Sequence, residues 1–304
     1  MGASDMKKFI INILIFFGVV AFVDVAAGKV FWYLQSTKAG GRTGAEYYAC
    51  KESNEDVIIM GSSRASHHYV PRIFEDSLEL TCFNAGQDGN GIILQYGRWK
   101  MISARYTPKI IIYDVNPAFD LCRNDNMAYV DRLKPFCSDD EVKAYVAGIF
   151  PMEKIKLFSQ MYRYNYKFIE MMFDCLKSGN DKEMGYIPLY GEIRKEIVDK
   201  ERPAKTTFII EDSVKVGYLE QLAIECKEKG TKLIFVASPA FRGGGYSIAT
   251  FNSVRKIAEK HNTPFFYYYE SDYSENPTLF KDSQHLNDEG AREFTIEIID
   301  RVLL

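Results

Sequence analysis

The sequence predicts an α/β fold built on a parallel β-sheet. Short apolar runs bounded by turn residues recur along the chain, as expected for strands that are buried on both faces. Segments of helical pattern separate these runs, and strand–helix alternation is typical of a parallel sheet that helices cover on both sides. The predicted strands are Val57–Met60, Leu80–Asn84, Ile110–Val115, Lys232–Ala237 and Pro264–Tyr268.

Two helices are predicted from particular signals in the second half of the chain. Ser213–Glu228 has helical periodicity, and Gly230 just beyond it is a stop signal. Asp288–Leu304 carries apolar residues on one face, which predicts an amphipathic helix packed on the sheet.

Residues 120–205 interrupt the strand–helix alternation. This stretch is rich in Met, Tyr, Phe and Lys, and Asp139–Phe150 and Glu153–Leu176 are predicted helices. We interpret it as a helical insertion packed over one end of the sheet. The stretch Tyr162–Tyr166, which includes Arg163, could line a substrate pocket, although ordinary helix packing explains such aromatic stretches more often.

The N-terminal segment, residues 1–35, is predicted to target the chain to a membrane. Lys7 and Lys8 precede the apolar stretch Phe9–Ala27, which is close to the length that spans a bilayer. Two forms remain open, an uncleaved signal anchor or a signal peptide cut near the small residues Val25-Ala26-Ala27. A buried core helix is the alternative, and the terminal position with flanking lysines favours the membrane over it.

Residues 36–54 are polar and contain several glycines, which predicts a linker between the anchor and a domain spanning 55–304. The aromatic cluster Phe31-Trp32-Tyr33 suits a membrane interface. The domain is therefore expected outside the cytoplasm, anchored to the membrane, or secreted if the segment is cleaved.

Composition and motif content argue against several classes of function. The net charge is −3 and no basic stripe is present, which argues against nucleic-acid binding. The six cysteines form no C-x-x-C pair, and no group of Asp and His has the spacing of metal ligands. Phosphate-loop and dinucleotide motifs are absent, so neither a metal nor a cofactor is predicted.

The candidate nucleophile is Ser63, in the motif Gly61-Ser62-Ser63-Arg64 directly after the first strand. A strand that turns sharply into a helix lifts a side chain to the carboxyl edge of the sheet, where N–H groups at the helix start can face a developing oxyanion. The alternative is an ordinary N-cap serine, which suits Ser62.

The candidate base and its orienting acid come from the other end of the chain. Asp282 stands three residues before His285, just ahead of the last predicted helix. Such a loop lets the carboxylate reach one imidazole nitrogen while the other nitrogen points outward. Each motif alone is weak, but together they supply the nucleophile, acid and base of serine acyl chemistry.

Two further loops offer hydrogen-bond donors for an oxyanion. The glycines of the loop 84–91 would let backbone approach a substrate closely, although a plain glycine turn is the simpler explanation. Asn116, after the third strand, offers a side-chain N–H, although asparagine before proline is also a common turn residue.

These four blocks resemble those of SGNH (GDSL-like) hydrolases. The GSSR form of the first block, the apolar N-terminus and the following His67-His68-Tyr69 are similar to membrane-anchored bacterial members of that family. The resemblance implies a flavodoxin-like three-layer α/β/α fold and hydrolysis or transfer of small acyl groups. It also implies that Gly89 and Asn116, with the Ser63 N–H, are the oxyanion donors, that Asp282 and His285 are the acid and base, and that the anchoring membrane is the bacterial inner membrane. Beside these residues, His67 and Arg163 are further candidate substrate contacts.

The chain departs from the family pattern at three positions. Ser62 stands where the first block usually has Asp, and Asn116 lacks the preceding glycine of the third block and is followed by proline. Arg64 replaces a usually apolar residue. It either binds an anionic group of the substrate or forms an internal ion pair.

Two functions follow as hypotheses. The first is a serine esterase or acyltransferase acting on small acyl groups such as acetyl, on an envelope or other polysaccharide or on a small ester, with residues 9–27 in the membrane. The second is a catalytically inactive envelope protein of the same fold that binds a glycan or a membrane partner. The distance between Ser63 and His285 discriminates between them.

Overall fold

The computed structural model describes residues 2–38, 40–123, 127–177, 183–201, 204–206 and 208–303. The chain divides into two compact units. The first comprises Met1–Tyr47 and Val130–Asn180, and the second comprises Tyr48–Tyr129 and Asp181–Leu304.

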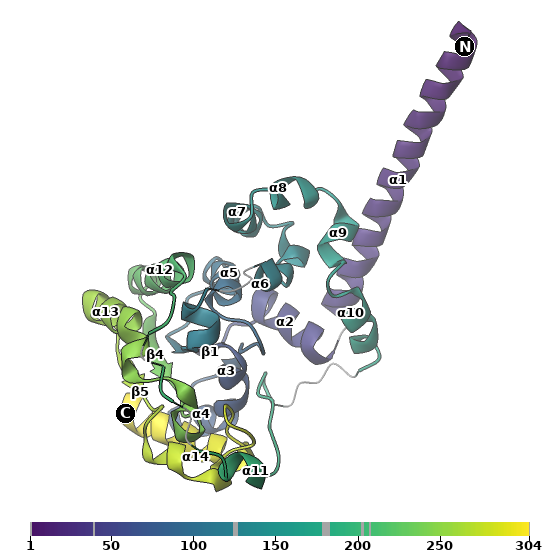
Figure 1. The fold of residues 1–304 in the computed structure, drawn as a ribbon. Coiled ribbons are helices and arrows are strands. Elements are labelled where there is room, and N and C mark those ends of the chain that lie inside the picture. Colours follow the sequence, from purple (N-terminus) through teal and green to yellow (C-terminus); the bar gives the residue numbers. More distant parts are fainter. Residues whose placement is uncertain are drawn as a thin grey trace. The chain divides into compact units, whose positions relative to one another are not determined.

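The second unit contains a parallel sheet of five strands in the order β2-β1-β3-β4-β5 (Figure 1). This is the strand order of flavodoxin-like sheets, so the predicted fold class is confirmed. Four strands differ from their predicted ends: β1 is longer by one residue, and β2, β3 and β5 are shorter than predicted. The strands are β1 (Val57–Gly61), β2 (Cys82–Asn84), β3 (Ile110–Asp114), β4 (Lys232–Ala237) and β5 (Phe265–Tyr267).

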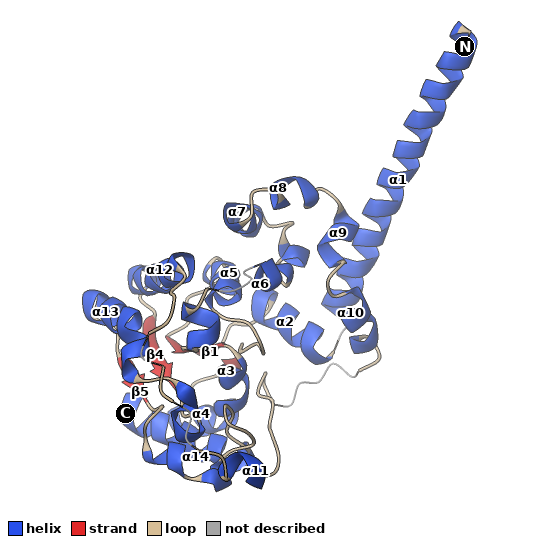
Figure 2. Cartoon of the chain, viewed as in Figure 1, coloured by secondary structure: helices blue, strands red, loops and turns tan. Residues whose placement is uncertain are grey.

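Helices cover the sheet on both faces, as Figure 2 shows for the strands drawn in red. One group packs together on one face, and it consists of α5 (Ile92–Ser103), α12 (Ser213–Lys229) and α13 (Asn252–His261). The other group consists of α3 (Ser63–His68), α4 (Pro71–Leu78) and α14 (Asp288–Ile298). The short helix α11 (Lys195–Val198) also belongs to this unit.

The core explains why the strands are apolar along their whole length. Ile59, Ile112 and Ile234 belong to one buried cluster with Phe74 of α4 and Phe294 of α14. Each such side chain stabilises the fold by roughly 1.5–3 kcal/mol relative to exposure. The helix predicted from Ser213 is confirmed, with Gly230 as its left-handed cap, whereas α14 ends at Ile298 and continues as a short turn of different pitch.

The described residues of the first unit form helices joined by turns and loops, with no strand among them. Its longest helix, α1 (Ala3–Thr37), contains the one described stretch that is long and apolar enough to cross a membrane. The others are α2 (Gly41–Lys51), α6 (Met127–Asp131), α7 (Asp140–Ile149), α8 (Glu153–Lys156), α9 (Gln160–Tyr164) and α10 (Phe168–Asp174), of which α2 and α6 reach into the second unit.

The structure differs from the sequence-based expectation in the predicted linker. Residues 36–54 contain the helix α2 instead of an extended linker. Tertiary contacts outweigh its glycine content, because the Tyr47 ring packs against Trp32 and Phe136, and the buried Glu46 carboxylate pairs with Lys167 at 2.5 Å.

The helices of the inserted segment differ in part from their prediction. Residues 130–177 belong to the first unit, together with the N-terminal helix. The helix predicted over Glu153–Leu176 is three short helices, because Ser159 caps a new helix by accepting a hydrogen bond from the Tyr162 N–H at 3.2 Å.

Candidate active site

Ser63 stands where the first strand turns into a helix. β1 ends at Gly61, whose φ of 142° favours glycine, and a Cβ there would lie 2.6 Å from the Asp114 carbonyl oxygen. Ser62 is the N-cap residue of α3, which begins at Ser63. The tight turn therefore brings Ser63 to the carboxyl edge of the sheet, with its N–H in a first helical turn that offers it no intrahelical acceptor.

His285 lies in a loop that its neighbours hold firmly. The Asp282 carboxylate accepts hydrogen bonds from the Gln284 and His285 N–H groups at 2.8 and 3.0 Å. The His285 carbonyl oxygen accepts from the Lys281 N–H at 2.9 Å, and Asn287 caps the helix that follows. These contacts fix the backbone of the loop, and thus the direction of the imidazole.

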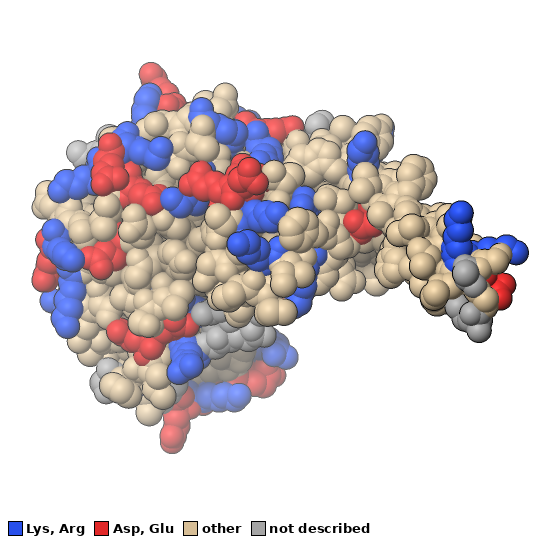
Figure 3. All heavy atoms as spheres, turned by 90° about the horizontal axis from the view of Figure 1, so that it is seen from above, with Lys and Arg blue, Asp and Glu red and all other residues tan. Residues whose placement is uncertain are grey.

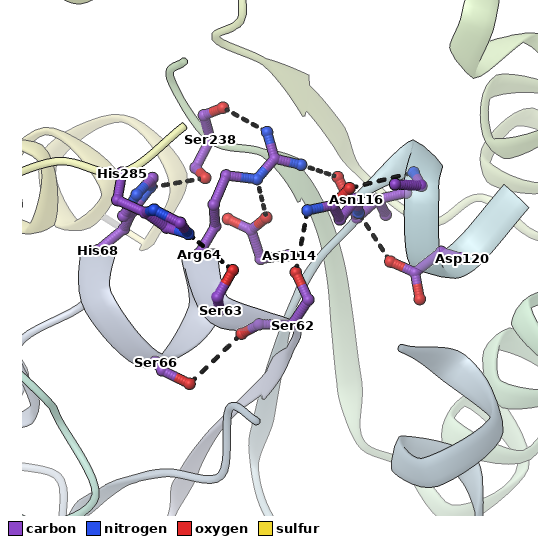
Figure 4. Close-up of polar contacts among 12 residues, drawn as sticks. Ser62, Ser63, Arg64, Ser66, His68, Asp114, Asn116, Asp120, Ser238 and His285 are labelled. Carbon is purple, nitrogen blue, oxygen red and sulfur yellow. Dashed lines mark hydrogen bonds and ion pairs between the residues drawn. The ribbon is translucent and has the colours of Figure 1, made fainter. Parts of the chain in front are cut away.

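The two distant motifs meet at this edge of the sheet. The Ser63 Oγ lies 2.7 Å from His285 Nε2, although 222 positions separate the residues (Figure 4). His285 Nδ1 lies 3.0 and 2.9 Å from the two carboxylate oxygens of Asp282. Because Nδ1 must donate to a carboxylate, Nε2 is the acceptor and the Ser63 hydroxyl donates to it. The distances are those of a nucleophile, a base and an orienting acid.

The electrostatics of Asp282 suit the orienting role. Burial opposes ionisation of this carboxyl group, but the hydrogen bonds and charge of His285, together with two backbone N–H groups, outweigh it. The pKa of Asp282 is therefore below its usual value, and the group is a carboxylate at neutral pH.

His68 is a site residue that the sequence alone did not single out. Its Nε2 accepts a hydrogen bond from the Leu286 N–H at 3.0 Å, and its Nδ1 lies 2.9 Å from the Ser238 Oγ. Nε2 is thus unprotonated, and Nδ1 carries the proton. Complete burial, and then the neighbouring His285 and Arg64, hold the pKa of His68 well below 6.5. A neutral imidazole therefore tethers the loop that carries His285.

Arg64 forms several contacts within the protein. The side chain is fully buried, its Nη2 donates to the Val115 carbonyl oxygen at 3.0 Å, and its Nε lies 3.7 Å from the Asp114 carboxylate. The guanidinium also lies over the Tyr269 ring, 4.4 Å from its centroid. Of the two predicted roles for Arg64, the structure therefore favours the internal ion pair, which lies beneath the Ser63 turn.

Asn116 directs its side chain at the same turn. Its Nδ2 donates to the Ser62 Oγ at 3.1 Å, while its Oδ1 accepts from the Ala118 N–H (Figure 4). The buried Asp120 carboxylate accepts from the Asn116 N–H at 2.7 Å and fixes the backbone there. Burial raises the pKa of Asp120 to about 6. One of the two Nδ2 hydrogens of Asn116 is engaged by Ser62, and the amide can offer the other to a ligand.

The loop after β2 uses most of its own N–H groups internally. A Cβ on Gly86 would lie 2.4 Å from the Ser66 nitrogen, so this glycine allows the loop to touch α3. The N–H groups of Gly86, Gln87 and Asn90 donate within the protein. Gly89 is exposed, with a φ of 68°, and within the described part of the chain its N–H has no recorded acceptor.

The other two predicted substrate contacts, His67 and Arg163, both have partners within the protein. The ring nitrogens of His67 face the Asp88 carboxylate at 3.2 Å and the Ile187 carbonyl oxygen at 2.6 Å, and the ring packs edge-on against His285. His67 therefore belongs to the wall of the site. Arg163 lies in the first unit, where it is buried and its Nε donates to the Leu157 carbonyl oxygen. Among the residues that the structure describes, no group of three His, Cys, Asp or Glu is placed to hold a metal ion.

Comparison with known proteins finds similar solved structures but no similar sequences. No protein-family model matches the chain, and no curated protein sequence matches it. A solved acetyl xylan esterase is 12% identical with a TM-score of 0.40, over 81% of this chain and 100% of its own. A two-domain esterase active on acetylated mannans is 11% identical with a TM-score of 0.41, over 80% of this chain and 47% of its own.

A third solved structure, described as a GDSL-like lipase from Parabacteroides merdae, is 13% identical with a TM-score of 0.39, over 82% of this chain and 97% of its own. GDSL-like enzymes are the group that the sequence motifs resemble. At these low identities and TM-scores, the chemistry of this chain has to follow from the geometry of its own site.

Proposed function

We propose that the chain is a serine esterase or acyltransferase of the SGNH type that acts on small acyl groups. The observation that carries the proposal is the pair of contacts from Ser63 Oγ to His285 Nε2 at 2.7 Å and from His285 Nδ1 to Asp282 at 2.9 Å. A separation far beyond hydrogen-bond reach would have favoured the inactive binding protein instead.

In the first half of the reaction, His285 Nε2 takes the Ser63 proton as Oγ bonds to the carbonyl carbon of an ester. Asp282 holds the imidazole in the productive tautomer and stabilises its positive charge. When the tetrahedral intermediate collapses, His285 gives the proton to the leaving alkoxide, and the acyl group remains on Ser63. In the second half, water or a sugar hydroxyl gives its proton to His285, attacks the acyl carbon and restores the Ser63 hydroxyl.

Three donors are proposed for the oxyanion, namely the N–H groups of Ser63 and Gly89 and the side-chain amide of Asn116. The first lies at the start of α3, the second has no recorded internal acceptor among the described residues, and the third has one hydrogen to offer. Each donor of this kind typically contributes 10²–10³-fold to kcat.

The proposed substrate is an acylated carbohydrate or a small ester, with acetyl as the acyl group. This choice rests on the motif resemblance and on the proposed location outside the cytoplasm. We also propose that α1 is a retained signal anchor. Cleavage after Ala27 would remove Asp24, whose carboxylate accepts hydrogen bonds from the Gln160 and Met161 N–H groups within the first unit.

The test is hydrolysis of p-nitrophenyl acetate by the full chain in detergent. Ser63→Ala is expected to reduce activity to background, whereas Ser66→Ala, one turn further along the same helix, is expected to retain it. Adding a mono- or oligosaccharide acceptor and following acetylated product separates transfer from hydrolysis. Equal activity of the Ser63→Ala variant and the wild type would refute the proposed nucleophile, and an inactive but folded wild type would favour the binding protein.

A further inference from the structure

The helix α1 has two parts that differ in what surrounds them. From Ser4 to Val23 every residue is exposed, and between Lys8 and Asp24 there is no charged side chain, so this stretch is uncharged except near its tip (Figure 3). From Asp24 onward, one face of the same helix packs against other helices of the first unit, and Gly28 and Gln35 are buried. Asp24 thus marks where α1 enters the packed unit.

The uncharged stretch is too short to cross a bilayer alone. Phe9–Val23 contains 15 residues, which as a helix rise about 22 Å, whereas the hydrocarbon core is about 30 Å thick. The apolar residues Val25, Ala26 and Ala27 continue the helix without a break. If α1 spans the membrane, as proposed above, the hydrocarbon region extends past Asp24 by several residues.

Asp24 is compatible with that depth because other protein groups satisfy its carboxylate. It accepts hydrogen bonds from the Ser159 hydroxyl at 2.6 Å, the Gln160 N–H at 2.7 Å and the Met161 N–H at 3.0 Å. A carboxylate with three such donors avoids the cost of an unsatisfied charge in a medium of low dielectric constant. The start of α9 is thereby fixed at the level of Asp24 along α1.

The direction of α9 determines which residues lie closest to the membrane. α9 begins with Gln160, whose N–H donates to Asp24, and ends at Tyr164, whose ring contacts that of Phe31, so α9 runs along α1 away from the membrane-spanning part. Ser159, the residue directly before α9, donates to the Asp24 carboxylate, so the adjoining Phe158 also lies close to the level of Asp24. In Figure 1, α9 lies beside the C-terminal half of α1, and α8 lies above α9, toward the N-terminal end of α1.

The segment before α9 exposes large apolar side chains. Met152, Ile155 and Phe158 follow each other at intervals of three, and they are 64%, 64% and 70% exposed. Glu153 and Leu157, on the other side of the segment, are fully buried. Together with the exposed Met161, these three side chains form a set that we call the apolar ledge.

We propose that the apolar ledge, Met152, Ile155, Phe158 and Met161, inserts into the bilayer that α1 spans, at the boundary between the hydrocarbon and the interfacial layer. Its occupant is the lipid surface, because the ledge continues the surface of the spanning helix at the same depth. Lysines border it, since Lys154 and Lys156 alternate with the apolar residues and Lys143 lies over the Phe158 ring at 4.7 Å. Apolar residues flanked by lysines are typical of segments that lie in a membrane interface and attract anionic lipids.

The first test compares native methionines of the chain, with Met172 as the control for Met161. The full chain is placed in phosphatidylglycerol–phosphatidylcholine nanodiscs and exposed to a brief pulse of hydroxyl radicals. Met161 and Met172 are 45% and 44% exposed in the protein. Met172, however, lies on α10. In α10, Phe168 contacts Phe31 and the Asp174 carbonyl oxygen accepts from the Gly40 N–H, so Met172 lies further from the membrane than Met161 does.

Met152 and Met161 are expected to oxidise several times more slowly than Met172, as measured by mass spectrometry of their peptides. Equal rates for Met161 and Met172 would overturn the proposal. A chain that carbonate washes from vesicles would overturn it as well, because α1 would then not be inserted. Neither outcome depends on esterase activity, so a failure here is distinct from a failure of the proposed function.

A second measurement distinguishes lipid from another copy of the chain. Phe158→Trp and Phe173→Trp place an indole at positions of similar exposure, 70% and 64%, on the ledge and on α10. In nanodiscs of brominated lipid, the emission that Phe158→Trp adds over the wild type is expected to be quenched strongly, and that of Phe173→Trp weakly. Protection of the methionines without quenching at position 158 would mean that a second copy covers the ledge, and would overturn the proposal.

Discussion

Replacing Asp282 by asparagine tests how His285 is oriented and charged. The substitution keeps the size of the side chain and an oxygen that can accept from the two backbone N–H groups of the loop. It removes the negative charge that lies 2.9 Å from His285 Nδ1. The imidazolium that forms in the transition state would then lose its counter-charge.

The magnitude follows from the distance and the exposure. Two unit charges about 4 Å apart near a protein surface attract each other by about 4 kcal/mol. Because the Asp282 side chain is 43% exposed, solvent screening reduces this to about 2 kcal/mol, which is roughly 30-fold in kcat. An asparagine that donates to Nδ1 would also favour the wrong tautomer, which raises the loss toward about 10⁴-fold.

The assay is steady-state hydrolysis of p-nitrophenyl acetate by the full chain in detergent. We expect kcat of Asp282→Asn to fall by at least about 30-fold, with a smaller change in KM. Asp272→Asn, which neutralises an exposed carboxylate of a neighbouring segment, is the control and should leave kcat unchanged. If Asp282→Asn retains wild-type kcat, the proposed role of Asp282 is wrong.

Three further substitutions test other parts of the site. Asn116→Ala should lower kcat by about 10²–10³-fold, and Ser62→Ala by much less, as measured in the same assay; equal losses would contradict an oxyanion role. Arg64→Met leaves the buried Asp114 unpaired and should cost about 3–5 kcal/mol of unfolding free energy, with KM unchanged in the folded fraction. The low pKa of His68 means that only the unfolded chain binds its proton readily, so lowering the pH from 7 to 5 should cost about 2 kcal/mol of stability; His68→Gln should remove this part of the pH dependence of unfolding.

The sequence predicted the sheet because its strands are buried on both faces. Such strands are apolar throughout, so runs such as Val57–Met60 and Lys232–Ala237 stand out from their surroundings. It also predicted the site residues that follow strand ends, since parallel strands place their carboxyl ends at one edge. The sequence therefore predicted that Ser63 and Asn116 lie near each other. It did not predict that Ser63 contacts His285 at this distance or that Asn116 donates to Ser62.

The sequence could not predict features that depend on distant partners. α2 is held by contacts from Glu46 to Lys167 and from Tyr47 to Phe136, which no local pattern reveals. The tether from His68 to Leu286 joins residues 218 positions apart. Asp24 is a charged residue within the apolar stretch Phe9–Ala27, and only the structure identifies the α9 N–H groups that it accepts from.

The most direct test of the central claim is covalent labelling of Ser63. Full-length protein is treated with a fluorophosphonate, digested, and its peptides are identified by mass spectrometry. We expect a phosphonyl adduct on Ser63 in the wild type, no labelling of Ser63→Ala, and strongly slowed labelling of His285→Ala. An unlabelled Ser63 in folded wild type, or an adduct confined to another residue, would contradict the account.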